Sequence, residues 1–295
     1  MIKICFIAFF AAVSSLPVSA QFFYGTDDFN DNSFASGRWN TGTGALSAGV
    51  GTGTFTETNS RLELTTSIAA TGNTNYSLYR FWANDATGNT SYTDSWVAMV
   101  RVTIDPAFLP VSATPNSRGG STRLGLEVAM AGTNSGYMNI YLTTANLGYN
   151  VGTGSGVWNG TSAYTSSSDS FSGGIGNYGP TTDVFLRLSH DGSARTLTSS
   201  YSFDSGATYS NLRTLNTDDW LVDPTTGFSL SLFTTNIRYG SPSPSYTVAS
   251  GQAYLDNFSV SAIPEPSTYA AIFGAGALAF AVWRRRATRP PAAKS

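Results

Sequence analysis

Carboxylates are the groups with which this chain could do acid–base chemistry, and between residues 21 and 263 only three of them are glutamates, Glu57, Glu63 and Glu127. Hydrolysis of a glycosidic bond needs two carboxyl groups, one on each side of that bond. Glu127 stands in RLGLEVAM without an acidic residue at positions 125 and 129, and Glu63 in RLEL shares the polar side of its pattern with Arg61. We therefore expect solvated surface carboxylates and no hydrolase motif.

Two other catalytic chemistries would depend on single residues, because the chain has one histidine, His190, and one cysteine, Cys5. His190 is next to Asp191 in an expected hairpin turn, where polar residues are ordinary. Cys5 lies in an apolar run at the start of the chain, so the body has no thiol for a disulfide, a thiolate metal site or a nucleophile. We predict no catalytic residue and expect that the protein is not an enzyme.

A calcium site is the one metal site that the sequence suggests. Ca²⁺ takes six to eight oxygen ligands, and the first and last strands of a β-sandwich often pair. Such pairing would bring Asp27 and Asp28 close to Asp256. The alternative is that Asp28 and Asp256 make turn or backbone hydrogen bonds, and both interpretations stay open. No other cofactor is expected.

The charge of the body argues against nucleic acid as a partner. Residues 21–263 hold ten arginines, no lysine and seventeen Asp and Glu residues, a net charge of −7. Binding to phosphates depends on clustered Lys and Arg, which release counterions. An acidic body fits an exported protein or a neutral polar ligand.

Five segments of the body alternate apolar and polar residues with a period of two, which is typical of antiparallel strands with one face in a core. They are WVAMVRVTI (96–104), RLGLEVAM (123–130), YMNIYL (137–142), DVFLRL (183–188) and GFSLSLF (227–233). Between strands lie two tracts rich in Gly, Ser and Thr, residues 40–60 and 143–182, and the second has no sustained apolar period. We expect an all-β fold, an antiparallel β-sandwich, in one domain over residues 21–262.

The clearest hairpin lies at residues 184–209, with His190-Asp191-Gly192-Ser193 as its turn and Asp204-Ser205-Gly206 as the next turn. This order, together with DDFNDNSFASGRWN at the start and AYLDNFSVSAI at the end, resembles concanavalin A-like and laminin G-like jelly rolls. The resemblance implies a jelly-roll sandwich with glycan as a ligand by fold-level analogy. Aromatic side chains stack on sugar rings, and the candidates are Trp82, Trp158 and Trp220, each with a structural role as the alternative.

The N-terminal segment has the features of a secretory signal peptide. MIKICFIAFFAAVSSLPVSAQ has a positive charge at Lys3, an apolar run, and small residues before a cut after Ala20. The expected signal peptide is residues 1–20, removed by signal peptidase.

The C-terminus ends in a proline pair, an apolar run and an arginine cluster. Residues 269–283 hold no charge, and a helix of that length spans roughly 23 Å, short of the ~30 Å hydrocarbon core. We expect a single transmembrane helix at 268–283 and a basic tail at 284–295, which stays in the cytoplasm and places the body outside the inner membrane.

This order, with the motif at residues 264–268, closely resembles the PEP-CTERM sorting signal of Gram-negative bacteria that make extracellular polysaccharide. In that family an exosortase cuts near the motif, so the resemblance implies processing at Pro264, Glu265 and Pro266 within a sorting segment 263–295. It implies transient anchoring, then release to the cell surface or the exterior. A retained single-pass anchor is the alternative.

Together these features predict an exported, non-catalytic surface or matrix protein that binds glycan and is associated with exopolysaccharide or biofilm. One alternative is a polysaccharide-active hydrolase whose carboxylate pair is Glu63 with Asp94 or Glu127. Another is a glycosylated coat protein whose Ser and Thr tracts carry sugars.

Overall fold

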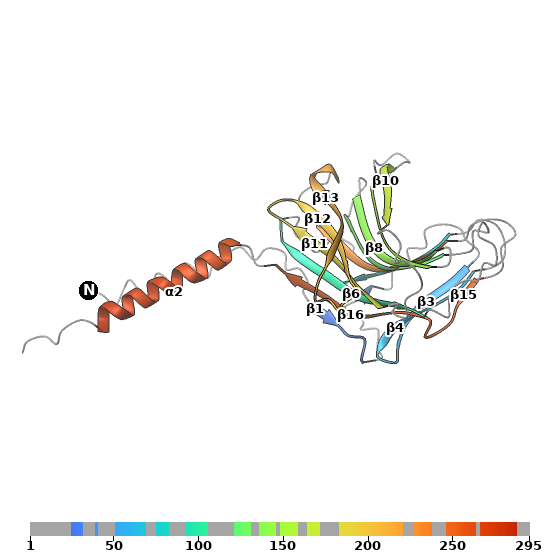
Figure 1. Cartoon of the computed structure of the whole chain (residues 1–295), viewed down its shortest axis with the longest axis horizontal. Coiled ribbons are helices and arrows are strands. Elements are labelled where there is room, and N and C mark those ends of the chain that lie inside the picture. Colours follow the sequence, from blue (N-terminus) through green and yellow to red (C-terminus); the bar gives the residue numbers. More distant parts are fainter. Residues whose placement is uncertain are drawn as a thin grey trace, which may run out of the picture. The chain divides into compact units, whose positions relative to one another are not determined.

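The computed structural model describes residues 25–31, 39–40, 51–68, 75–82, 93–105, 121–130, 136–145, 148–158, 164–171, 183–220, 227–237, 246–263 and 266–287. The chain divides into two compact units, residues 1–261 and 262–295. The described part of the first unit consists of antiparallel strands in two facing sheets (Figure 1). The predicted antiparallel β-sandwich is confirmed. The signal peptide at residues 1–20 lies outside the described residues.

The larger sheet has nine strands. Its order is β13-β12-β11-β6-β16-β4-β15, while β1 pairs with β16 and β3 pairs with β4. The bounds are β1 Gly25–Asp27, β3 Gly51–Thr58, β4 Arg61–Ile68, β6 Trp96–Ile104, β11 Asp183–Asp191, β12 Thr196–Ser202, β13 Ser210–Asn216, β15 Tyr246–Val248 and β16 Ala253–Ala262. The pairing of β1 with β16 confirms that the first and last strands of this sheet are neighbours.

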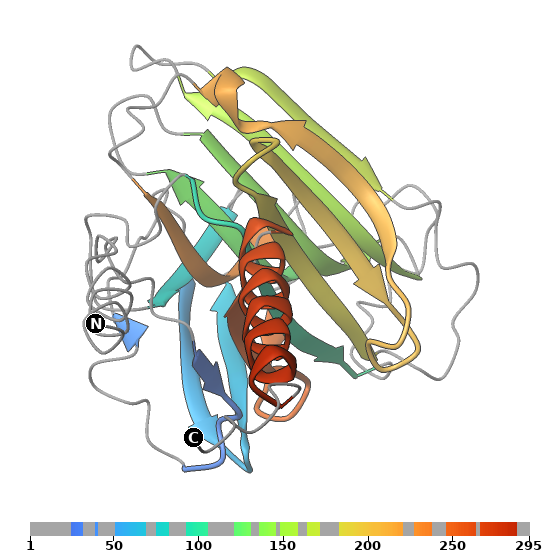
Figure 2. The same ribbon diagram turned by 90° about the vertical axis from the view of Figure 1, so that its left-hand side faces the viewer.

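The smaller sheet has seven strands in the order β10-β9-β8-β7-β14-β5-β2, so that β7 is its middle strand. The bounds are β2 Trp39–Asn40, β5 Asn75–Trp82, β7 Ser121–Met130, β8 Gly136–Ala145, β9 Gly148–Trp158, β10 Tyr164–Phe171 and β14 Phe228–Ile237. A short 3₁₀ helix, η2 Thr217–Trp220, follows β13. Figure 2 shows the curved sheets of the body from a second direction.

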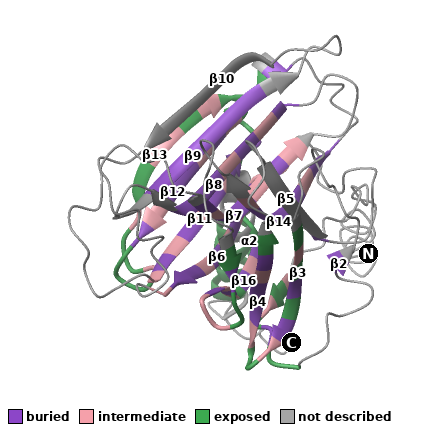
Figure 3. Cartoon of the chain, turned by 90° about the vertical axis from the view of Figure 1, so that its right-hand side faces the viewer, coloured by how far each residue is buried: buried purple, intermediate pink, exposed green. Residues whose placement is uncertain are grey.

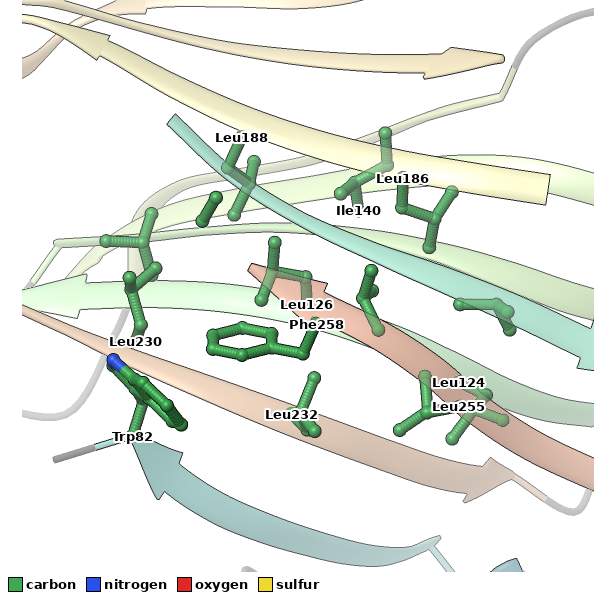
Figure 4. Packing of buried hydrophobic residues seen from close by; sticks show 14 of the residues in the cluster. Trp82, Leu124, Leu126, Ile140, Leu186, Leu188, Leu230, Leu232, Leu255 and Phe258 are labelled. Carbon is green, nitrogen blue, oxygen red and sulfur yellow. The ribbon is translucent and has the colours of Figure 1, made fainter. Parts of the chain in front are cut away.

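The core lies between the two sheets, where the predicted apolar faces meet. Leu124 and Leu126 from one sheet pack with Leu186, Leu188 and Phe258 from the other (Figure 4). Along β11 buried residues alternate with half-buried ones, as a strand with one face in the core requires (Figure 3). Burying each leucine contributes about 1.5–3 kcal/mol, so this interface holds the sheets together.

Turn chemistry fixes the register of the predicted hairpin. The Asp191 carboxylate accepts hydrogen bonds from the backbone N–H groups of Ser193 and Ala194, both at 2.9 Å, and these bonds hold the β11–β12 turn. At the next turn, Ser205 and Gly206 adopt φ values of 60° and 85°, the left-handed conformation that glycine tolerates best. Both turns lie at the predicted sites, but β11 continues through Asp191, so the first turn consists of residues 192–195.

The tracts of Gly, Ser and Thr are not loops throughout, and here the expectation from sequence was wrong. Residues 51–58 form β3, and residues 148–158 and 164–171 form β9 and β10. Glycine fits β9 for a steric reason, because a Cβ at Gly152 would lie 2.6 Å from the Tyr141 ring of the neighbouring strand. At Gly152, the absence of a larger side chain therefore reflects close packing against β8.

The second unit contains the helix α2, Pro266–Ala287. It begins at a proline, which is tolerated in the first helical turn because the N–H groups there have no helical partner. Phe273, Leu278, Phe280 and Trp283 are exposed along it. Among the described residues, no helix combines the length and the apolar character that a membrane span requires.

Candidate functional site

Glu63 is buried, not solvated as expected from its sequence pattern, and its side chain is 1% exposed. Arg61 pairs with it as predicted, at 2.9 Å, and Asn59 and Ser250 also donate hydrogen bonds to it. Burial alone would raise the pKa of Glu63, but the hydrogen bonds from Ser250, Asn59 and Arg61 together hold it below its usual value. Glu63 therefore joins the β3–β4 turn to the segment before β16, which is a structural role.

The carboxylate pairs considered in the sequence do not form. Leu62 and Leu64 face the core on β4, as Leu126 and Val128 do on β7, so Glu63 and Glu127 lie on opposite outer faces of the sandwich. Glu63 pairs with Tyr254, and the segment just before that residue reaches the end of β6 at Asp105. Asp94 precedes the start of β6, a strand of nine residues or about 30 Å. The predicted pairing of Glu63 with Asp94 or Glu127 is therefore wrong.

Glu127 occupies the middle strand of the seven-stranded sheet on its outer face. It is half-buried, and its Oε2 accepts a hydrogen bond of 3.1 Å from the Asn139 amide. Asn139 is oriented in turn, because its Oδ1 accepts a 2.8 Å hydrogen bond from the backbone N–H of Gly154. Burial raises the pKa of Glu127 to about 7, although the hydrogen bond from Asn139 lowers it. The expectation of a solvated carboxylate was wrong here too.

Buried aromatic rings support the face beside Glu127. Tyr141 is fully buried, packs edge-on to Phe233 at 6.1 Å, and carries the Arg123 guanidinium 4.7 Å above its ring. Tyr141 lies between Gly125 and Gly152 in the sheet register. The outer face therefore combines a fixed carboxyl, an oriented amide and a guanidinium, a set that can donate to and accept from the hydroxyl groups of a ligand.

Asn139 and Tyr141 were not among the predicted site residues. Alternation does place both on the side of β8 opposite Met138 and Ile140, but the partners across the sheet depend on register, which the sequence pattern does not reveal. Register places Glu127 directly opposite Asn139.

His190 lies in the core at the end of β11 and not in the turn, which corrects the prediction. It is fully buried, stacks on Trp96 at 5.9 Å and meets Phe228 at 4.7 Å. Its Nδ1 lies 2.8 Å from the carbonyl oxygen of Asp94, a hydrogen bond that fastens the segment before β6. Burial lowers the pKa of His190, although the hydrogen bond to Asp94 and the charge of Asp191 raise it.

We expect His190 to make the fold sensitive to acid. Because its pKa is lowered in the native state, the unfolded chain binds a proton that the native chain does not as the pH falls below about 6.5. Stability is therefore lost toward low pH. The variant His190→Phe should lose less stability than the wild type between pH 7 and 5, measured by urea unfolding. An identical pH dependence in both proteins would show that His190 does not titrate with unfolding.

Two of the three predicted tryptophans, Trp82 and Trp220, do not offer a surface for stacking. Trp82 is 7% exposed and packs against Trp39 and Phe258, while Trp220 is 2% exposed and packs against Phe228. A ring stacks on a sugar through an exposed face, so we assign these two to the core. The side chain of Trp158 lies outside the described residues.

The three aspartates suggested for calcium have protein partners. Asp27 accepts hydrogen bonds from Phe29 N at 3.0 Å and Trp39 Nε1 at 2.7 Å, and Asp256 accepts one from Asn257 N at 2.7 Å. Burial raises the pKa of Asp256, and the nearby charge of Asp28 adds to this. The described residues include no group of three or more His, Cys, Asp or Glu that could hold a metal ion. The calcium site stays a prediction, and a Ca²⁺-dependent rise in melting temperature would reveal it.

The C-terminal segment carries a motif of known type. Residues 262–286 match the model of the PEP-CTERM protein-sorting motif. The motif runs from the end of β16 through most of α2, and Pro266 is the first residue of the helix. Pro264 and Glu265 lie outside the described residues. The motif implies an exosortase as the processing partner and export toward the cell surface or the exterior.

The body is similar to solved structures of carbohydrate-active proteins at low identity. An engineered GH43 glycoside hydrolase has a TM-score of 0.47 and 16% identity over 85% of this chain and 42% of that chain. A β-1,3-glucanase from Mycobacterium marinum has a TM-score of 0.46 and 14% identity over 82% of this chain and 100% of that chain. Lectin I-B4 from Griffonia simplicifolia has a TM-score of 0.35 and 10% identity over 73% of this chain and 93% of that chain. The chain spans less than half of the GH43 hydrolase. No curated protein sequence matches the chain.

Proposed function

We propose that the chain is exported, held at the inner membrane by α2, and cut near residues 264–266 by an exosortase. The match of residues 262–286 to the sorting motif supports this most directly. Signal peptidase removes residues 1–20, cutting after Ala20. Arg284, Arg285 and Arg286 keep the end of the helix in the cytoplasm, so the body folds on the outer side and is then released to the cell surface.

We further propose that the released body is a non-catalytic glycan-binding protein associated with extracellular polysaccharide or biofilm. The observation that carries this is the arrangement at Glu127, whose carboxyl is held by Asn139 at the centre of the seven-stranded sheet. Its Oε1 makes no hydrogen bond within the described residues, so it is available to the hydroxyl groups of a sugar. Asn139 on β8 and Arg123 on β7 belong to the same face and carry further donor groups.

A second acidic position lies in the same row as Glu127 within the described strands of this sheet. Asp169 on β10 lies in the same row as Glu127, through Asn139 and Gly154. Three strand spacings separate the two residues, about 14 Å between their Cα atoms. Glycosidase carboxyl groups lie about 5–9.5 Å apart, so a catalytic pair would require both side chains to extend toward each other, and we propose binding.

A hydrolase is the second candidate, and one observation favours it. Burial raises the pKa of Glu127 to about 7, the range in which a carboxyl can act as a general acid at neutral pH. Glu127 would then need a base from outside the described residues.

A comparison of two variants tests these functions. The full-length chain, Glu127→Gln and the control Asp218→Asn, which removes an exposed carboxylate paired with Arg195, are applied to a glycan array and to a reducing-sugar assay. We expect binding at least tenfold weaker in Glu127→Gln, unchanged binding in Asp218→Asn, and no sugar release.

Other outcomes would support the alternatives. Sugar release by the wild type that is lost in Glu127→Gln would establish the hydrolase. Equal binding by all three would show that Glu127 is not in the site. Hexose increments in the intact mass would indicate the glycosylated coat protein.

A further inference from the structure

An open groove of about 410 Å³ lies on the nine-stranded sheet, across β3, β4 and β15. Its described lining residues are Thr52, Gly53, Thr54, Thr65, Thr66, Ser67, Thr247, Val248 and Ala249. No charged and no aromatic side chain is among these described residues, whereas six of the nine carry a hydroxyl group. The volume falls within the range of about 300–1,000 Å³ that is usual for ligand sites.

Strand register arranges the hydroxyl groups in rows. Thr52 pairs with Ser67, which pairs with Thr247, so the three side chains stand in one row across three strands. Thr54 and Thr65 form the next row on the same side. Neighbouring strands lie about 4.8 Å apart and successive residues on one side about 6.7 Å apart. The outer side of the groove therefore presents five of the six hydroxyl groups in two rows, while Thr66 is buried.

Most of these hydroxyl groups are exposed and have capacity to bind. Thr52, Ser67 and Thr247 are exposed, and their side chains make no hydrogen bond within the part of the chain that the structure describes. Thr54 makes only a long one, 3.2 Å to the carbonyl oxygen of Phe55. Each hydroxyl donates one hydrogen bond and accepts two, which complements another hydroxyl group better than it complements a charge.

The groove faces away from Glu127. Phe55 and Leu64 point from β3 and β4 into the core, so Thr54 and Thr65, their chain neighbours, point outward from the nine-stranded sheet. Glu127 points outward from the other sheet. The two surfaces thus lie on opposite sides of the sandwich.

We propose that this groove binds a neutral polysaccharide chain and that the body is bivalent, with one glycan contact on each outer face. The proposal rests on the proposed function at Glu127. A neutral, hydroxyl-rich ligand fits because the described lining offers no cation for a phosphate or uronate and no aromatic ring, and six of its nine residues carry a hydroxyl group. Two contacts that point in opposite directions can hold two chains at once, so the body cross-links polysaccharide.

The test removes the hydroxyl groups and keeps the shape of the strands. The triple variant Thr52→Val, Ser67→Ala, Thr247→Val replaces the first row of the groove. The matched control Thr198→Val, Thr214→Val removes an exposed pair of hydroxyl groups, 3.0 Å apart, on β12 and β13 of the same sheet. Full-length chains are measured for retention on immobilised dextran and soluble β-glucan, with alginate as the acidic comparison, and for co-sedimentation with each polymer in solution.

We expect the wild type and the control to be retained by a neutral polymer and to cross-link it into a sedimenting complex. The triple variant should bind at least tenfold more weakly and form no sedimenting complex, and Glu127→Gln should behave in the same way. A triple variant that binds and cross-links like the wild type would overturn the groove while leaving Glu127 in place. If the triple variant loses binding while Glu127→Gln binds like the wild type, the groove is supported and the proposed site at Glu127 is overturned. A wild type that binds neither neutral polymer overturns both.

Self-association is the remaining outcome. If the wild type is a dimer without polysaccharide and the triple variant is a monomer, the groove is an interface between copies of the chain and the proposal is wrong. Sedimentation velocity of both proteins decides this.

Discussion

Replacing Gly125 with alanine is expected to lower the free energy of unfolding of the body by about 3 kcal/mol. Gly125 lies on β7, two residues before Glu127. A Cβ there would lie 2.1 Å from the carbonyl oxygen of Ile140 and 2.7 Å from the Cα of Tyr141. Both are backbone atoms of the adjacent strand, so β7 and β8 would have to separate. Urea unfolding followed by circular dichroism measures the loss.

Gly274→Ala is the control for this substitution. Apart from its own helix backbone, no described atom lies within 4 Å of a Cβ at Gly274 on the exposed helix α2, so the body should keep its stability. Because Gly125 also borders the Glu127 face, Gly125→Ala should weaken glycan binding as well. If Gly125→Ala has the same free energy of unfolding as the wild type, β7 and β8 are not packed as closely as described.

Glu127→Gln is expected to stabilise the body at pH 8 by about 2 kcal/mol. The pKa of Glu127 rises from 4.5 in the unfolded chain to about 7 in the fold because of burial. Between these values the native chain keeps a proton that the unfolded chain has lost, so the wild type loses stability as the pH rises. The expected gain is below the full linkage value because the side chain is only half-buried.

Urea unfolding of the wild type and Glu127→Gln at pH 5, 6, 7 and 8 measures this effect. The difference between the two proteins should grow from pH 5 to pH 7 and stay constant above it. Comparing the proteins at each pH removes the opposite trend of His190, which both share. A variant that is less stable than the wild type at pH 8 would contradict the burial of this carboxyl.

The strands with large apolar residues could be predicted from the sequence. WVAMVRVTI was predicted as a strand at the same bounds that β6 has, because its alternation of buried and half-buried residues continues through seven positions. The turns at Asp191 and Asp204 were likewise evident, because Asp and Gly are the residues that such turns need. Local chemistry decides these features.

The strands made of small residues could not be predicted. β9 contains four glycines in GYNVGTGSGVW, and its place depends on Tyr141 of β8, which fills the space that larger side chains would need. The same limit applies to β3, GTGTFTET. Tertiary packing overrides the low strand propensity of glycine in these segments.

The burial and the hydrogen-bond partners of Glu63 and Glu127 could not be predicted from the sequence pattern either. Alternation placed Glu63 and Glu127 on the side of their strands away from the core, which is where they lie. It did not show that Ser250, 187 residues away, binds Glu63, or that Asn139 faces Glu127 across the sheet. Burial of a polar residue depends on such distant partners, and so do its pKa and its role.

The C-terminal sequence of the protein recovered outside the cell tests the central claim most directly. Cleavage near the sorting motif predicts a product that ends close to residues 264–266 and lacks α2, so mass spectrometry should detect no peptide that contains Trp283 or the arginines after it. Recovery of an extracellular protein that still carries Trp283 and Arg284–Arg286 would contradict the account.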